Sequence, residues 1–149
     1  MCAMQTVVRT IMAVIIGLIV GSLVNLGIIE FNTAVLFPAP PDSDLSDPVQ
    51  FQAYLDTLPA LAFFMVMLAH LGQAFVGGLL AARLAPDRPM RIAIVIGALT
   101  LAGGIAAMLQ FTAPPWFKVE LLLYIPAAYA AGSLERRRRA SNAADAASS

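Results

Sequence analysis

Four long stretches of the chain contain no charged residue, and this feature constrains the fold more than any other. They cover residues 10–29, 57–82, 92–117 and 121–134. Because a bilayer core of roughly 30 Å needs about 20 helical residues, each of the first three is long enough to cross it. The fourth is long enough only if its helix begins near Pro115, and proline is favoured in the first helical turn. Hydrophobic residues make up 60% of the chain and charged residues 12%, which is too apolar for a water-soluble domain.

We therefore predict an all-α fold, a four-transmembrane-helix bundle in a single membrane domain over residues 1–134. The predicted spans cover about residues 7–29, 58–82, 92–111 and 115–134. The first stretch exceeds the roughly 7–15 apolar residues of a signal peptide and no A-x-A site follows it, so we expect it to be retained. Residues 135–149 are predicted to form a basic and then disordered cytoplasmic tail.

The distribution of basic residues predicts the orientation of these spans. With a cytoplasmic N-terminus, eight of the nine basic residues lie on the cytoplasmic side and Lys118 alone lies outside. Cytoplasmic loops carry an excess of Lys and Arg, so we expect N-in/C-in topology. The run Arg136–Arg139 is then interpreted as a topology anchor that also attracts anionic lipid headgroups.

A short amphipathic helix is predicted in the first extracytoplasmic loop. Asp47 suits the N-cap, Pro48 the first helical position, and Gln50 completes a capping box. The apolar residues that follow share one face, namely Phe51, Tyr54, Leu55 and Leu58. We expect this helix to lie on the outer membrane surface and to end near Pro59.

Small residues recur at four-residue spacing in the first three spans, which predicts close helix contacts. Lipid provides no hydrophobic drive between helices, so spans associate where small residues let their backbones approach. The predicted packing positions are Gly17, Gly21, Gly77, Gly78, Gly97, Gly103 and Gly104.

His70 is the one histidine of the chain and falls near the middle of the second span. Ionisable residues inside a membrane are costly, so they indicate function by default: a proton relay, a ligand contact or an axial metal ligand. The alternative is a neutral imidazole that hydrogen-bonds another helix. Glu120 is the one carboxylate on the outer side of the last span, and we expect it well above His70 in depth, without direct pairing.

Further polar residues are predicted in the outer half of the bilayer, where they would line a recess that opens outward. The candidate ligand-binding residues are His70, Gln73, Asn25, Gln110, Glu120 and Tyr124. No catalytic motif is present: H-E-x-x-H, G-x-S-x-G and phosphate-binding Gly loops are all missing. Asp42, Asp44 and Asp47 lack the glycine and distal glutamate of a calcium loop. We predict no enzyme activity, no metal, no cofactor and no nucleic-acid partner.

The order of several residues resembles a family of small, functionally uncharacterised bacterial four-helix membrane proteins over roughly residues 7–134. The matching positions are Asn25, Ala69-His70, Gly72, Gly77, Gly103-Gly104, Pro115-Trp116-Phe117, Glu120 and Tyr124-Ile125-Pro126. That family often carries Asp where this chain has Glu120, which keeps the carboxylate. The resemblance implies four spans and a bacterial inner membrane, and it implies no activity.

Two hypotheses of function follow. The first is a small-molecule binding or transport-accessory module, with the lipid bilayer and a second copy of itself as partners, in which His70 marks the recess. The second is a purely structural membrane protein in which His70 only cross-links helices. An intramembrane enzyme or a haem-binding subunit is a weaker third hypothesis, because no nucleophile–base pair is apparent in the sequence.

Overall fold

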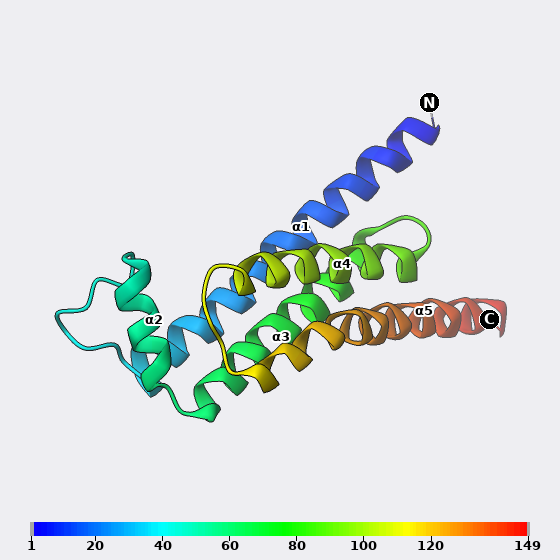
Figure 1. The fold of residues 1–149 in the computed structure, drawn as a ribbon. Coiled ribbons are helices and arrows are strands. Elements are labelled where there is room, and N and C mark those ends of the chain that lie inside the picture. Colours follow the sequence, from blue (N-terminus) through cyan, green and yellow to red (C-terminus); the bar gives the residue numbers. More distant parts are fainter. Residues whose placement is uncertain (1, 149) are drawn as a thin grey trace.

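The computed structural model describes residues 2–148, and the predicted all-α class is confirmed (Figure 1). No strand occurs in this described range. In chain order the elements are α1 (Cys2–Phe31), the π-helical turn η1 (Asn32–Leu36), α2 (Pro48–Thr57), α3 (Ala60–Leu84), α4 (Pro89–Met108), the 3₁₀ helix η2 (Pro115–Leu122) and α5 (Tyr124–Ser148).

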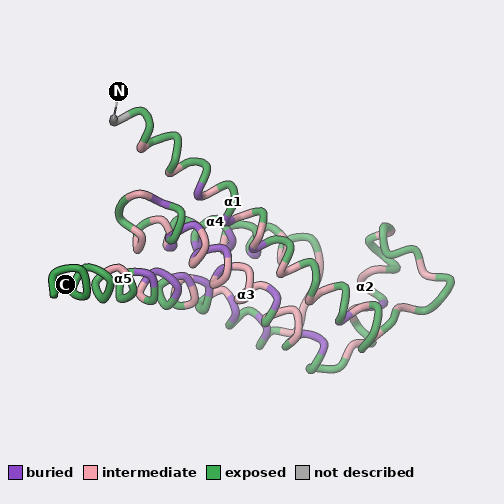
Figure 2. Tube along the Cα trace, turned by 180° about the vertical axis from the view of Figure 1, so that it is seen from behind, coloured by how far each residue is buried: buried purple, intermediate pink, exposed green. Residues whose placement is uncertain are grey.

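Three helices within residues 2–148 are long and apolar enough to cross a membrane. They are the segment Met4–Leu36, which joins α1 and η1, together with α3 and α4. Large apolar side chains are exposed along much of α1, as expected for a helix whose outer face meets lipid rather than water (Figure 2). The third segment lies slightly earlier than predicted, because α4 begins at Pro89, after Arg88 turns the chain with φ of 51°, and it ends at Met108 instead of residue 111.

The fourth predicted segment begins at Pro115 as expected, but its first part is a 3₁₀ helix. Pro126 lacks a backbone N–H and cannot donate to the carbonyl of Leu122, so α-helical bonding starts only with Ala127 donating to Leu123. A 3₁₀ helix eclipses side chains three residues apart, and accordingly Phe117 and Glu120 are both buried.

Helix α3 occupies the centre of the bundle and packs against α1, α4 and α5 (Figure 1). Its contact with α1 depends on missing side chains: a Cβ on Gly17 would lie 2.6 Å from the carbonyl oxygen of Gly77, and one on Gly77 would lie 2.7 Å from that of Gly17. A Cβ on Gly21 would similarly lie 2.7 Å from the carbonyl oxygen of Gln73. The backbones of α1 and α3 are therefore in direct contact along this face.

The remaining predicted packing glycines fall into three cases. Gly97 and Gly104 leave room for α5, since a Cβ on either would lie 2.5 Å from Ala128 Cβ or from the Tyr124 hydroxyl, respectively. Gly78 has only ordinary contacts, at 3.6 Å and beyond. The prediction for Gly103 is wrong, because a Cβ there would meet nothing within 4 Å.

The tail predicted to be disordered is instead helical, since α5 continues to Ser148. Buried Glu135 accounts for part of this difference. Its carboxylate accepts hydrogen bonds from Arg138 (2.8 and 2.9 Å) and Arg139 (2.9 Å), and Arg83 of α3 lies 3.5 Å away. Arg139 also donates to the carbonyls of Ala82 (2.7 Å) and other residues at the C-terminal end of α3.

This arginine thereby caps α3, whose last carbonyls have no helical partner of their own. Two of the four arginines predicted to face lipid headgroups are thus engaged within the protein. Arg136 and Arg137 are exposed.

We expect this cluster to make stability depend on acid pH. Hydrogen bonds from Arg138, and also from Arg139, lower the pKa of Glu135 from 4.5 to about 2. A lowered folded-state pKa stabilises the fold above pH 4.5, and that stabilisation is lost as the pH falls toward 2. We therefore expect the melting temperature in mild detergent, measured from pH 7 to pH 2, to decrease as the pH is lowered past about 5.

Glu135→Gln is the control, because it cannot ionise. It should melt below wild type at neutral pH and approach it near pH 2. Parallel curves for the two proteins across the whole range would contradict this assignment.

The predicted loop helix corresponds to α2, with the Asp47 side chain accepting from the Val49 N–H at 2.9 Å. Gln50 does not complete a capping box, because its side-chain oxygen accepts from the N–H of Asp44 instead. Helix α2 connects two other segments: the Tyr54 hydroxyl donates to the Phe37 carbonyl after α1, and Gln52 exchanges two hydrogen bonds with the backbone of Thr112 after α4.

Candidate functional site

A cleft of about 230 Å³ lies among the four long helices of the bundle. Helix α1 contributes Leu18 and Asn25, α3 contributes His70 and Gln73, and α5 contributes Tyr124; the α4 wall consists of Leu99, Thr100, Gly103, Gly104 and Ala107. The exposed position of Gly103 has a structural explanation here, since the missing side chain leaves space that belongs to the cleft.

His70 pairs directly with Glu120, and the prediction that they lie too far apart is wrong. The His70 Nδ1 atom is 3.2 Å from Oε1 and 3.1 Å from Oε2 of Glu120. The Glu120 side chain is 1% exposed and that of His70 is 21% exposed. The prediction assumed an α-helix from Trp116, whereas a 3₁₀ helix rises 2.0 Å per residue and places Glu120 about 10 Å along from Pro115 rather than about 7.5 Å.

Tyr124 completes this group from the first turn of α5. Its ring stacks on His70, with centroids 6.1 Å apart and planes inclined by 26°. The side chain is buried, and Gly104 provides the space for its hydroxyl. The hydroxyl approaches the Glu120 carboxyl but makes no hydrogen bond of normal geometry with any group in residues 2–148.

The polar side chains of α1 and α3 extend the group along the cleft. Gln73 donates to the Ser22 hydroxyl at 3.3 Å. The side-chain nitrogen of Asn25 is buried and has no hydrogen-bond partner in the described part of the chain. An amide donor buried in this way costs free energy unless something accepts from it.

Of the six predicted site residues, five lie together and Gln110 does not. Its amide donates to the Ala106 carbonyl at the end of α4, and it is exposed. Sequence reasoning missed Ser22 and Thr100. Thr100 follows Ile96 by four residues, which is the spacing at which threonine bonds to its own helix, and it donates to Ile96 and Gly97 carbonyls at 3.0 Å.

The chemistry available here is hydrogen bonding and proton exchange. A carboxylate at Nδ1 favours the tautomer with hydrogen on Nδ1, so Nε2 is left as an acceptor. Thr100 bonds to backbone rather than to His70, so it is not paired with a base. No group of three or more metal-ligating side chains was found within residues 2–148.

Comparison with known proteins gives no relative: no family model matches the chain, and no curated protein or solved structure matches it significantly. The resemblance to four-helix bacterial proteins therefore stays a prediction. Any function must be argued from the geometry of the cleft.

Proposed function

We propose that this protein is a bacterial inner-membrane protein that crosses the bilayer four times and binds a small molecule in the cleft around His70. The fourth crossing combines η2 with the first part of α5. With eight residues at the 3₁₀ rise and the rest at the α rise, residues 115–134 extend about 34 Å, enough for a bilayer core of roughly 30 Å.

The N-in/C-in topology is supported by the basic residues. Arg9, Arg83, Arg88 and Arg91 fall at the same end of the helices as the arginine run of α5, whereas Lys118 falls at the other. The Glu135 cluster joins residues of α3 and α5 at that end. The positive-inside rule makes this the cytoplasmic side.

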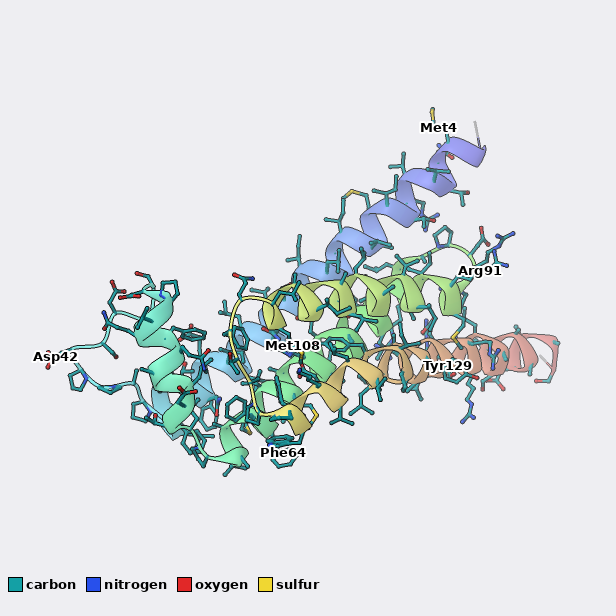
Figure 3. All side chains as sticks on the ribbon, in the orientation of Figure 1. Met4, Asp42, Phe64, Arg91, Met108 and Tyr129 are labelled. Carbon is teal, nitrogen blue, oxygen red and sulfur yellow. The ribbon has the colours of Figure 1, made fainter. Side chains whose placement is uncertain are left out.

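Cysteine labelling checks this topology. In a Cys2→Ser background, which removes the one native thiol, Asp42→Cys should react with a membrane-impermeant maleimide in intact cells. Asp42 lies at the tip of the loop before α2 (Figure 3). Ser141→Cys should react only after the membrane is opened. Labelling of Ser141→Cys in sealed cells would show that the topology is wrong.

The observation that carries the binding proposal is two buried polar atoms without hydrogen-bond partners, next to the hydrogen-bonded His70–Glu120 pair. Asn25 presents a buried amide nitrogen and Tyr124 a buried hydroxyl, both beside the His70–Glu120 pair. Protein interiors seldom leave such groups unpaired, because each costs about 1–3 kcal/mol. A bound molecule that accepts hydrogen bonds would satisfy both at once. The few convergent polar groups within an otherwise apolar wall are typical of a ligand site.

Native mass spectrometry from mild detergent tests the proposal and also reports whether copies of the chain associate. Wild type should retain a bound molecule of defined mass, whether or not that molecule is a lipid. Gly103→Leu should lose it, because Gly103 lines the cleft and has open space at its Cβ position, so the larger side chain can occupy the cleft. Gly27→Leu is the matched control, since a Cβ there also meets nothing within 4 Å and Gly27 does not line the cleft.

Retention of every bound molecule by Gly103→Leu would contradict binding in this cleft. The structural hypothesis would then be favoured, and it has one observation of its own: the His70–Glu120 pair already joins α3 to η2. The exposed arginines Arg136 and Arg137 would in either case be available for anionic lipid headgroups.

A further inference from the structure

The cleft lies along a seam between two helices that scarcely touch. Helix α3 packs broadly on α1, α4 and α5, whereas α1 and α4 make few contacts with each other. Both contribute to the cleft wall, with Leu18 and Asn25 on one side and Leu99 and Gly103 on the other. Figure 1 shows α1 at an angle to α4 and α5.

The polar floor of the cleft is reachable through this seam. Leu99 is 47% exposed, and the hydrogen bond from Gln73 of α3 to Ser22 of α1 is itself exposed. Both sides of the seam belong to helices that are apolar enough to span a membrane. The surroundings of the seam are therefore hydrocarbon in the proposed topology.

The outer ends of the same two helices are, in contrast, connected. Helix α2 bonds to Phe37 after α1 through Tyr54, and to Thr112 after α4 through Gln52. The rings of Phe51 and Phe111 add an edge-to-face contact with centroids 5.7 Å apart. The chain thus connects α1 and α4 at their outer ends, through α2. Within the proposed membrane-spanning region the two helices make few contacts with each other.

We propose that the ligand enters from the bilayer through the α1–α4 seam, and that it is a neutral lipid-soluble molecule with a carbonyl at its polar end. This inference rests on the proposed function and adds the route and the chemical class. A cleft that opens toward the bilayer replaces the recess that the sequence predicted to open outward.

The chemical class follows from the groups that lack partners. The Asn25 amide nitrogen can only donate, so the ligand must supply an acceptor oxygen, whereas the Tyr124 hydroxyl beside the Glu120 carboxyl can donate or accept. No lysine or arginine lines the cleft, so nothing there selects an anion. A cavity of 150 Å³ holds a benzene ring, so about 230 Å³ accommodates one substituted ring or an ester group, with an apolar tail lying in the seam.

Two sources share this chemistry, a quinone with an alkyl tail and a diacylglycerol, and titration distinguishes them. The probes are a benzoquinone with a ten-carbon tail, the same quinone without the tail, and dioctanoylglycerol. Binding is read as an increase in melting temperature in micelles at two detergent concentrations. A tail that lies in the α1–α4 seam adds apolar contact beyond partitioning, so the tailed quinone should reach half-saturation at a lower mole fraction in the micelle than the tailless quinone at both detergent concentrations.

We expect either the tailed quinone or dioctanoylglycerol to raise the melting temperature of wild type and of Gly27→Leu. The same probe should leave the melting temperature of Gly103→Leu unchanged. Asn25→Ala should fold, since it removes an unpartnered group, and should weaken binding about tenfold, the equivalent of one hydrogen bond of about 1.4 kcal/mol. Equal half-saturating mole fractions for the tailed and the tailless quinone would show that no tail lies in the seam and would overturn entry from the bilayer.

Failure of this inference is distinguishable from failure of the proposed function. A charged or water-soluble molecule found by native mass spectrometry and lost in Gly103→Leu would overturn the lipid-soluble class but leave a binding function intact. If Gly103→Leu changes neither the retained molecules nor any titration, both ideas are wrong.

Discussion

Gly77→Leu is expected to destabilise the protein by about 3 kcal/mol, the upper end of the usual cost of overpacking. A Cβ at this position would already lie 2.7 Å from the carbonyl oxygen of Gly17 and 3.4 Å from the Cα of Gly21. Both atoms belong to backbone, which cannot turn aside as a flexible side chain can. The larger residue must therefore separate α1 from α3 along their main contact.

The measurement is the melting temperature in mild detergent, where about 3 kcal/mol corresponds to a decrease of roughly 6–12 °C for a domain of this size. Gly27→Leu is the matched control, because the same change is made in a helix at a site with open space. It should leave the melting temperature unchanged or raise it slightly, since glycine is a poor helix former. Equal effects of the two substitutions would show that α1 and α3 do not pack through Gly77.

His70→Leu is expected to lower the free energy of unfolding by a similar amount, for an electrostatic reason. The change removes the hydrogen-bond partner of Glu120 and leaves a fully buried carboxyl without compensation. Leaving a buried hydrogen-bonding group without its partner costs about 1–3 kcal/mol, and more when that group is charged. His70→Asn and His70→Gln both keep an amide donor, and Asn places it where Nδ1 lies, so His70→Asn should retain most of the stability.

A double-mutant cycle isolates this interaction. Combining His70→Leu with Glu120→Leu should restore part of the stability lost by His70→Leu alone, because the pair is then replaced by apolar groups. Additive losses would mean that the two side chains do not interact. The same variants separate function from structure: if His70→Gln folds yet loses the bound ligand, His70 serves binding and not only helix packing.

Local sequence patterns were sufficient for the features that depend on one helix at a time. Charge-free length predicted the segments 10–29, 57–82 and 92–117, and three helices capable of spanning a membrane occupy them. Asp47 and Pro48 predicted the start of α2, because an N-cap and a first-turn proline act within a few residues. The repeated glycines indicated which faces of α1 and α3 have no side chains in the way, and these faces meet.

Features that depend on how two helices are aligned were not predictable in this way. The distance from His70 to Glu120 depends on where η2 changes from 3₁₀ to α geometry, which is set by Pro126 and by the packing of Phe117 on Phe63. Gly103 matches a packing pattern in sequence, yet it lies at a cleft, where α1 and α4 make few contacts with each other.

The arginine run of α5 combines one feature that the sequence predicted with others that depend on the alignment of two helices. Its position in the sequence determined which end of the bundle is basic, since that depends only on the order of spans and charges. Only the tertiary structure decided that Arg139 caps α3 and that Glu135 is buried beside it. Periodicity describes the surface of a single helix, whereas these contacts depend on the rotation and offset of one helix against another, and those follow from side chains far apart in the chain.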